Sequence, residues 1–167
     1  YRIPGMTNKE SKALEMASAV LSQGNSSRMF KKMVDDKKNS LQVGSFNYAL
    51  EDYGAYITYA LPNAETPLDT LLKDIDDEVV KLQNQLISVE EFTKIQNQFE
   101  NAFVDKNNRM LGVAENLADG YTFYKNTNNL NTELDEIRKV TRQDIMNAAK
   151  KYLNRNQRVV LYYLPKK

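Results

Sequence analysis

The stretch ALEMASAVLSQGNSSRMFKKMVDDKK, residues 13–38, contains the pattern that decides the fold. Apolar residues recur at helical spacing up to Leu21, and Gly24 then provides a residue that readily takes the left-handed conformation after a helix end. Ser26 or Ser27 can cap a second helix with an apolar face. That face consists of Met29, Phe30, Met33 and Val34. The stretch therefore predicts two helices joined by a glycine turn.

The residues before this stretch predict a strand end and a helix start. Residues 1–5, Tyr-Arg-Ile-Pro-Gly, have the composition of a strand that runs into a turn. Thr7 and Glu10 have the spacing of a capping box, in which each side chain satisfies a backbone donor at the first turn of a helix. We therefore expect the first helix to begin at Thr7.

A β-hairpin is predicted directly after the second helix. Residues 41–50 alternate partially between apolar and polar side chains, and residues 55–61 are dense in tyrosine and aliphatic side chains. The link Glu51-Asp52-Tyr53-Gly54 has the composition of a turn. Pro62 cannot donate to a strand ladder and ends the second strand.

A block of helices follows the hairpin. Thr66-Pro67 predicts one helix start, Ser88 to Glu91 form a second capping box, and Thr141 caps a late helix. A break near Asn107 separates two of these helices. The side chains expected to face inward after the break are Leu111, Ala114, Leu117, Ala118 and Tyr121.

Residues 158–164, Arg-Val-Val-Leu-Tyr-Tyr-Leu, predict a final strand that Pro165 ends. The order is then strand, two helices, two strands, a block of helices and a strand. This order is typical of an α+β fold with two layers, in which helices pack on one face of a mostly antiparallel sheet. We expect residues 1–167 to form a single domain, which is a fragment of a larger multidomain protein.

Composition excludes several classes of function. The 167 residues include 23 basic and 22 acidic side chains, so no net charge favours nucleic acid or an anionic membrane as a partner. No apolar run approaches the ~20 residues of a membrane-spanning helix. The chain contains no cysteine and no histidine. Thiolate nucleophiles, disulfides and histidine bases are therefore excluded.

No residue is predicted to be catalytic, to bind a cofactor or to bind a metal. Asp74 and Glu78 are four residues apart and could chelate a cation, but they flank an apolar stripe and are expected to be solvated surface. Ser26, Ser27 and Ser40 lie near lysines in the sequence, yet no spacing marks a Ser-Lys dyad. The chain is therefore expected to be catalytically silent.

Several pieces in this order resemble the pitrilysin/insulinase family of zinc peptidases. The pieces are residues 1–5, 21–30, 34–38, 50–54, 88–92, 140–145 and 158–165. The resemblance covers nearly the whole chain and identifies it as a non-catalytic, C-terminal-type domain of one half of such a peptidase. It also implies the fold of the LuxS and processing-peptidase group of metalloproteases.

The resemblance implies that the zinc lies outside this chain. In the family an upstream domain carries the zinc motif H-x-x-E-H, and the partner half often adds an arginine and a tyrosine near the substrate. At the matching positions this chain has Val34 and Leu41, and Arg28 is not in the arginine's position. No family site residue is therefore carried over, and Arg28 is expected to be structural. The family's habit suggests export to the periplasm or cell envelope.

The function implied by the resemblance is that of a companion domain in a zinc metalloendopeptidase. We expect this chain to pack on the zinc domain, to line the chamber and to help bind a peptide substrate that adds a strand to a sheet edge. One alternative is a scaffold or interaction domain in a catalytically inactive paralogue. A second is an unrelated peptide-binding α+β module.

Overall fold

Three strands form an antiparallel sheet within residues 1–164, which are the residues that the computed structural model describes. The strands are β1 (Arg2–Pro4), β2 (Ser40–Ala49) and β3 (Tyr53–Pro62), and their order in the sheet is β1–β3–β2. β2 and β3 pair from Ala49 opposite Gly54 to Ser40 opposite Pro62. The predicted hairpin and the predicted strand at the start of the chain are therefore confirmed.

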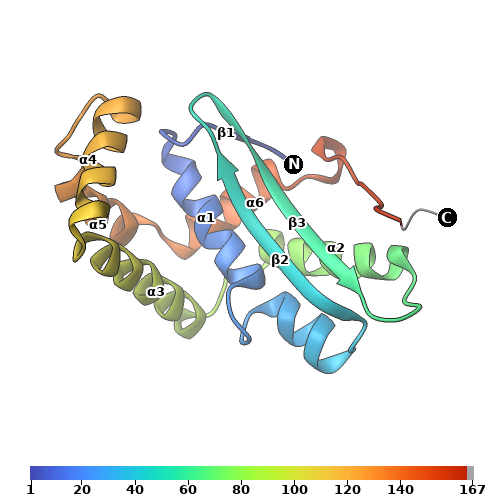
Figure 1. Cartoon of the computed structure of the whole chain (residues 1–167). Coiled ribbons are helices and arrows are strands. Elements are labelled where there is room, and N and C mark those ends of the chain that lie inside the picture. The colour runs from blue at the N-terminus through green and yellow to red at the C-terminus, as the bar shows by residue number, and fades with distance from the viewer. Residues whose placement is uncertain (165–167) are drawn as a thin grey trace.

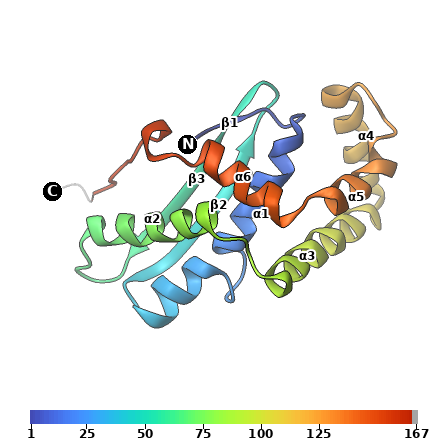
Figure 2. The same ribbon diagram turned by 180° about the vertical axis from the view of Figure 1, so that it is seen from behind.

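Helices cover one face of this sheet. The helices are α1 (Lys9–Ser22), η1 (Phe30–Asp36), α2 (Leu68–Asn84), α3 (Val89–Asn107), α4 (Met110–Tyr124), α5 (Asn129–Lys139), α6 (Arg142–Tyr152) and η2 (Arg155–Gln157). In Figure 2, which views the molecule from behind, α2 and α6 lie in front of the sheet, and the face of the sheet toward the viewer in Figure 1 carries no helix. α3, α4 and α5 extend to one side. The predicted two-layer α+β fold is confirmed.

The alternation of side chains along the hairpin separates core from surface. Val43 and Tyr56 point to the helices and are buried, with Tyr56 only 1% exposed. On the other face the aromatic and aliphatic side chains are exposed, and their exposed fractions reach 56% for Tyr48 and 59% for Tyr53. The exposed set also includes Phe46, Ile57, Tyr59 and Leu61. The outer face of the sheet is therefore apolar and uncovered within residues 1–164.

Two of the predicted helix caps are wrong. Asn8, not Thr7, caps α1, because the Asn8 side chain accepts the Glu10 N–H at 2.9 Å. The Glu10 carboxylate, predicted to complete a capping box, instead accepts from Lys151 and Tyr152. η1 has no side-chain cap, and the Ser26 hydroxyl instead accepts from the Lys94 ammonium at 2.9 Å. The Ser26 hydroxyl therefore has a tertiary partner and the Ser27 hydroxyl is buried with no hydrogen-bond partner among the described residues, and local spacing reports neither.

Other predicted features of the helix ends are confirmed or shifted by one residue. Gly24 has the predicted left-handed conformation, with φ of 78°. α2 begins at Leu68 with Pro67 as the cap residue, one position later than predicted. Thr141 and Asp144 form a complete capping box at α6. Ser88 caps α3 by accepting the Glu91 N–H at 3.0 Å.

Asp74 and Glu78 of α2 are buried, which corrects the prediction that they are solvated surface. Asp74 is 2% exposed and Glu78 is 3% exposed. Lys32 of η1 lies 3.4 Å from an Asp74 oxygen and 3.3 Å from a Glu78 oxygen, and Lys37 contacts Asp74 at 2.5 Å. Asn39 donates to the second Asp74 oxygen at 2.8 Å. Lys32 of η1 and Lys37, which directly follows η1, therefore lie against this side of α2. The spacing of residues within α2 could not predict this contact.

The pKa of Asp74 predicts how stability depends on pH. Burial raises this pKa, but hydrogen bonds from Lys37 and Asn39 and the charge of Lys32 outweigh burial and lower it overall. The carboxylate therefore stabilises the fold above the unfolded pKa of about 3.9, and this contribution is lost as the pH falls through the lower folded value. We expect Asp74→Asn to lose about 1–3 kcal/mol at pH 7, because it weakens hydrogen bonds to a buried charge.

Urea unfolding at a series of pH values would test this expectation. The difference between the wild-type chain and Asp74→Asn should narrow below about pH 4. Asp77→Asn is the matched control, because its carboxylate is on the same helix with a side chain 45% exposed, and it should change stability little. A constant difference between wild type and Asp74→Asn down to pH 2 would contradict the assignment.

Helix α4 presents its apolar stripe to solvent, opposite to the prediction. Leu111 is 71% exposed, Tyr121 is 68% exposed and Leu117 is 39% exposed. The residues that α4 buries are instead Gly112, Asn116 and Gly120. The helix is therefore amphipathic in the reverse sense, with small and polar residues inward.

Close approach of the backbone explains this reversal. A Cβ atom at Gly112 would lie 1.9 Å from the Lys106 carbonyl oxygen, and one at Gly120 would lie 2.9 Å from the Asn126 carbonyl oxygen. Asn116 donates to the Asn107 side chain at 2.9 Å. The glycine face must therefore turn toward the neighbouring chain segments, and the leucines lie on the opposite face.

Substitutions on the two faces of α4 should change the free energy of unfolding by different amounts. Gly112→Ala should destabilise the chain by about 1–3 kcal/mol through the clash at Lys106, although alanine is the better helix former. Leu111→Lys should change the free energy of unfolding by no more than about 0.5 kcal/mol, because its side chain is exposed. Urea unfolding of both variants would measure the difference, and the reverse ranking would contradict this orientation of α4.

Candidate functional site

The two edges of the sheet differ in how their backbone groups are bonded within residues 1–164. An edge strand offers unpaired backbone N–H and C=O groups to an extended peptide. In the order β1–β3–β2, one edge is the outer side of β2. The other edge lies along β3. There β1 pairs with residues 53–55 of β3 only.

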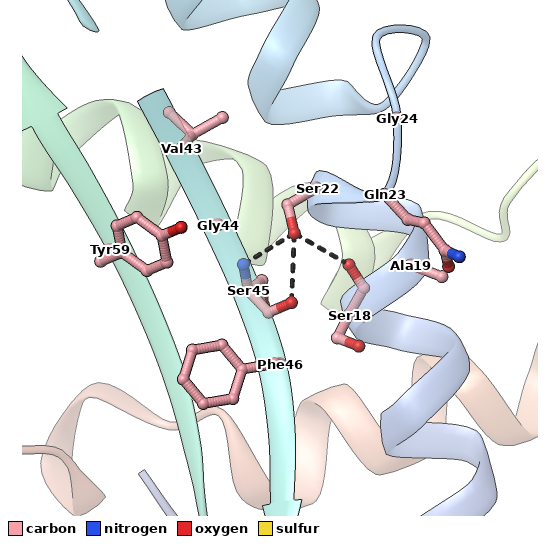
Figure 3. A pocket seen from close by; sticks show the side chains of 10 residues that line it. All are labelled: Ser18, Ala19, Ser22, Gln23, Gly24, Val43, Gly44, Ser45, Phe46 and Tyr59. Atoms are coloured by element: carbon pink, nitrogen blue, oxygen red, sulfur yellow. Dashed lines mark hydrogen bonds between the residues drawn. The ribbon is translucent and has the colours of Figure 1, made fainter. Parts of the chain in front are cut away.

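Helix α1 closes the edge of β2. The Ser22 hydroxyl oxygen accepts the Ser45 N–H at 2.7 Å, and the hydroxyl lies 3.1 Å from the Ser45 carbonyl oxygen, to which it can donate (Figure 3). Asn47 is held nearby, because its side-chain amide donates to the Ser11 carbonyl at 3.1 Å. A peptide strand cannot pair through Ser45 while Ser22 occupies both of its backbone groups.

The depression beside this closed edge offers little for a ligand to bind. Figure 3 shows the Tyr59 ring of β3 beside Gly44, which lies next to Ser45 on β2. A Cβ atom at Gly44 would lie 2.2 Å from this ring, so the glycine makes room for the aromatic side chain. The Ser18 and Ser22 hydroxyls here are bonded to backbone carbonyls, and the Tyr59 hydroxyl accepts from the Gln42 amide. We therefore assign this depression a structural role.

Thr58 and Ala60 of β3 lie just beyond the point where Tyr1 pairs with Tyr56. Tyr56 exchanges both backbone groups with Tyr1, donating its N–H to the Tyr1 carbonyl at 2.8 Å and accepting from the Tyr1 amino group at 2.9 Å. Because strand residues alternate, the N–H and C=O groups of Thr58 and Ala60 point to the same side. Within residues 1–164 no strand pairs with them on that side.

An apolar groove of about 310 Å³ lies beside this part of β3. Its floor is formed by Thr58–Pro62 of β3 and by one side of α2, and its outer wall is the segment of residues 158–163. The α2 side chains that line it are Leu68, Leu71, Leu72 and Ile75. A groove with this lining can accept the apolar side chains of a peptide.

The final strand predicted over residues 158–164 is not formed. No strand is assigned there, and no backbone hydrogen bond joins these residues to β3. Two side-chain contacts hold the segment on α2 instead. The Arg158 guanidinium forms an ion pair with Asp76, and the Tyr162 hydroxyl donates to an Asp69 oxygen at 2.7 Å. These contacts to α2 keep the segment away from bonding distance of β3.

At the inner end of the groove, the lining includes the charged side chain of Arg158, which is paired with Asp76. Asp76 is 6% exposed, and Arg155 also reaches it at 3.1 Å. The hydrogen bonds to Asp76 raise the pKa of Arg158, so this guanidinium stays charged. The rest of the groove has an apolar lining.

The residues that the family resemblance singled out do not lie in this groove. Arg28 makes a bidentate ion pair with Glu91 at the start of α3, with distances of 2.9 and 2.7 Å. Its expected structural role is confirmed. Val34 lies in η1, and Leu41 is 59% exposed at the start of β2. The structure brings none of these residues together.

The rest of residues 1–164 presents neither a metal-binding cluster nor a helix able to span a membrane. No group of three or more acidic, histidine or cysteine side chains in this part is arranged to hold a metal ion. None of its helices has the length and apolar character needed to cross a membrane.

Sequence reasoning missed the groove, although one signal for it was present. The apolar stripe of α2 is wider than contact with one layer requires, because Leu68 and Leu72 lie beside the buried row that contains Leu71 and Ile75. Leu68 and Leu72 are only partly buried. A stripe of this width indicates a second apolar contact on the same helix.

The role of Ser22 in closing β2 can be tested by removing its hydroxyl. Ser22→Ala should destabilise the chain by about 1–3 kcal/mol, because the Ser45 N–H loses its partner. The Ser45 amide should also exchange faster with deuterium. Ser18→Ala is the control, since the Ser18 hydroxyl donates only within α1, to the Glu15 carbonyl at 2.7 Å. Equal exchange of Ser45 in wild type and Ser22→Ala would show that Ser22 does not protect this edge.

Comparison with known proteins finds a family and several relatives. The profile of the family described as "Peptidase M16 inactive domain" matches residues 1–99. The zinc protease PqqE of Helicobacter pylori is 24% identical over 165 residues, which are 99% of this chain and 37% of that protein. The chain therefore spans less than two fifths of the length of this relative.

Solved structures share the fold. A protease from Helicobacter pylori superposes with a TM-score of 0.86 at 25% identity, over 94% of this chain and 38% of that one. The inactive peptidase domain of a proposed zinc protease from Bordetella parapertussis superposes with a TM-score of 0.87 at 20% identity, over 100% of this chain and 90% of that one. The second comparison shows that this fold has been solved separately from the rest of a peptidase.

Proposed function

Because the chain belongs to the peptidase M16 inactive domain family, we propose that it is the non-catalytic companion domain of a zinc endopeptidase. In this proposal it packs on the zinc-bearing domain, lines the chamber and binds a peptide substrate along the edge of β3. The observations that carry the proposal are the match of residues 1–99 to the inactive domain of this peptidase family and the apolar groove of about 310 Å³ between β3 and α2. The chain supplies no catalytic residue in this proposal.

The geometry of the β3 edge supports binding of an extended peptide. A peptide strand beside Thr58 and Ala60 would exchange backbone hydrogen bonds with them, which requires no particular side-chain sequence. Alternate side chains of the peptide would enter the groove against Leu68, Leu71 and Leu72. The groove is apolar, so we propose that it favours peptides with aliphatic or aromatic residues at alternate positions.

Two exposed apolar surfaces support packing against another domain. One is the stripe of α4 that contains Leu111, Leu117 and Tyr121, and the other is the outer face of the sheet. Helix-on-sheet packing buries surfaces of these two kinds. An apolar surface of this extent on a domain indicates an interaction site.

A binding experiment with the isolated chain would test the peptide-binding part. We expect a fluorescein-labelled heptapeptide with the sequence of residues 158–164 to bind, and the same peptide with alternate amides N-methylated to bind at least about tenfold more weakly. The methyl groups remove the N–H donors that strand addition requires. Equal affinity for both peptides would contradict binding by strand addition.

The isolated chain should not cleave peptides. We expect no product when it is incubated with an unfolded peptide and zinc, because it lacks histidine and is proposed to supply no catalytic residue. Mass spectrometry of the peptide would measure cleavage. Cleavage that appears with zinc and disappears with a chelator would contradict the proposal.

The packing role is testable in the parent peptidase. Leu111→Asp combined with Leu117→Asp should lower the activity and stability of the parent by placing charges in the proposed interface. Asp119→Asn, on an exposed residue of the same helix, is the control and should change neither. A parent that lacks H-x-x-E-H upstream would instead support a scaffold role.

A further inference from the structure

We propose that η1 is a conformational device with two states, held in its present π-helical form by the carboxylate of Asp74. This inference is independent of the proposed peptide binding. η1 covers Phe30–Asp36, directly before the link to β2, and lies beside α2, as Figure 2 shows in light blue. When the Asp74 carboxylate no longer holds it, the segment rewinds as an α-helix and loosens the start of the hairpin.

The backbone hydrogen bonds of this segment become longer in sequence span toward its end. At the start, the Lys31 N–H donates to the Ser27 carbonyl, four residues earlier, at 3.0 Å, as in an α-helix. At the end, the Lys37 N–H donates to the Lys32 carbonyl, five residues earlier, at 3.0 Å, as in a π-helix. Sustained π winding is rare in proteins, so a contact from outside the segment is needed to hold it.

The π winding places two lysines on the same side of the segment. In an α-helix, residues five apart point about 140° away from each other, because each residue turns the helix by about 100°. A π-helix has a wider turn, so residues five apart lie nearly above one another. The Lys32 and Lys37 ammonium groups lie 3.4 and 2.5 Å from the same Asp74 oxygen. In α winding only one of these two lysines could reach Asp74.

Asp74 is the contact that favours the π form. It is 2% exposed, and a carboxylate buried to this extent requires cations and hydrogen bonds around it. Its second oxygen accepts from the Asn39 amide at 2.8 Å, in the link that follows η1. Lys32 would stay neutralised without Asp74, because it also lies 3.3 Å from a Glu78 oxygen. Loss of Asp74 therefore mainly frees Lys37 and Asn39.

The link between η1 and β2 transmits the state of η1 to the sheet. Lys38 has a φ of 52°, in the left-handed region that residues other than glycine rarely adopt. The Asn39 N–H donates to the Met33 carbonyl at 3.0 Å, and the Asn39 carbonyl accepts from the Asn63 N–H at 3.0 Å, just after β3 ends. Rewinding η1 would move Asn39 relative to Met33 and break both bonds.

Scalar couplings across hydrogen bonds, measured by NMR on the chain of residues 1–167, identify the carbonyl that each amide contacts. In the wild-type chain we expect the amide nitrogen of residue 37 to couple to the Lys32 carbonyl carbon. In Asp74→Ala and in Lys37→Met this coupling should be lost and replaced by one to the Met33 carbonyl carbon, which is the α-helical partner. A loss of stability by itself would not exchange one partner for another.

Two control variants remove matched side chains outside this contact. Asp77→Ala is the control for Asp74→Ala, because its carboxylate lies on the same helix with a side chain that is 45% exposed. Lys31→Met is the control for Lys37→Met, because Lys31 is an exposed lysine of the same segment. Both controls should keep the coupling to the Lys32 carbonyl.

Amide hydrogen exchange measures whether the change reaches the sheet. The Asn63 amide should exchange at least about tenfold faster in Asp74→Ala and in Lys37→Met than in the wild-type chain, because its acceptor on Asn39 moves. In Asp77→Ala and Lys31→Met its rate should stay as in the wild-type chain.

The outcomes decide between a held π-helix and the alternatives. A coupling to Lys32 that persists in both variants would overturn the proposal, because the π winding would then belong to residues 30–36 themselves. Loss of that coupling without a new one to Met33 would also overturn it, because the segment would have unwound. If Asp74→Ala does not fold, as judged by circular dichroism, the comparison of Lys37→Met with Lys31→Met decides alone.

Discussion

Three carboxylates on one helix are buried, and their neutralisation fixes the segments on both sides of that helix. Asp74, Asp76 and Glu78 of α2 are each less than 7% exposed. A buried carboxylate is tolerated only with cations and hydrogen bonds around it. For Asp74 and Glu78 these come from η1 and α2, and for Asp76 they come from Arg155 and Arg158.

This constraint connects the fold to the proposed site. Because Asp76 holds Arg158, the end of the described chain follows α2 and lies beside β3 without pairing. The groove exists in the space that this arrangement leaves, between the α2 leucines and β3. At the other edge, Ser22 binds both backbone groups of Ser45. Helix α1 therefore blocks this edge of the sheet at Ser45.

The surfaces of the domain fit the role of a part in a larger enzyme. The α4 stripe and the outer face of the sheet are apolar, and nothing within residues 1–164 covers them. The fold matches a region of the Helicobacter pylori protease that is 38% of that chain. A domain without catalytic residues can still serve an enzyme by holding its substrate and by shaping the space in which the reaction occurs.

Local patterns predicted most elements of the fold. The hairpin, the left-handed Gly24, the cap at Thr141 and the break after Asn107 each depend on neighbours within a few residues, so their physical cause lies in the sequence itself. Alternation with a period of two also separated Tyr56 from the outer tyrosines. The order of these elements was sufficient to indicate the α+β class and the family.

Tertiary contacts decided the features from which function is proposed. The orientation of α4 depended on how closely Gly112 approaches Lys106, and helical spacing alone favoured the opposite face. The burial of Asp74 depended on lysines about 40 residues away. Residues 158–164 have the composition of a strand, but Arg158 found its partner on α2. Composition determines what a segment can form, whereas long-range charge pairs and close backbone contacts determine which partner it meets.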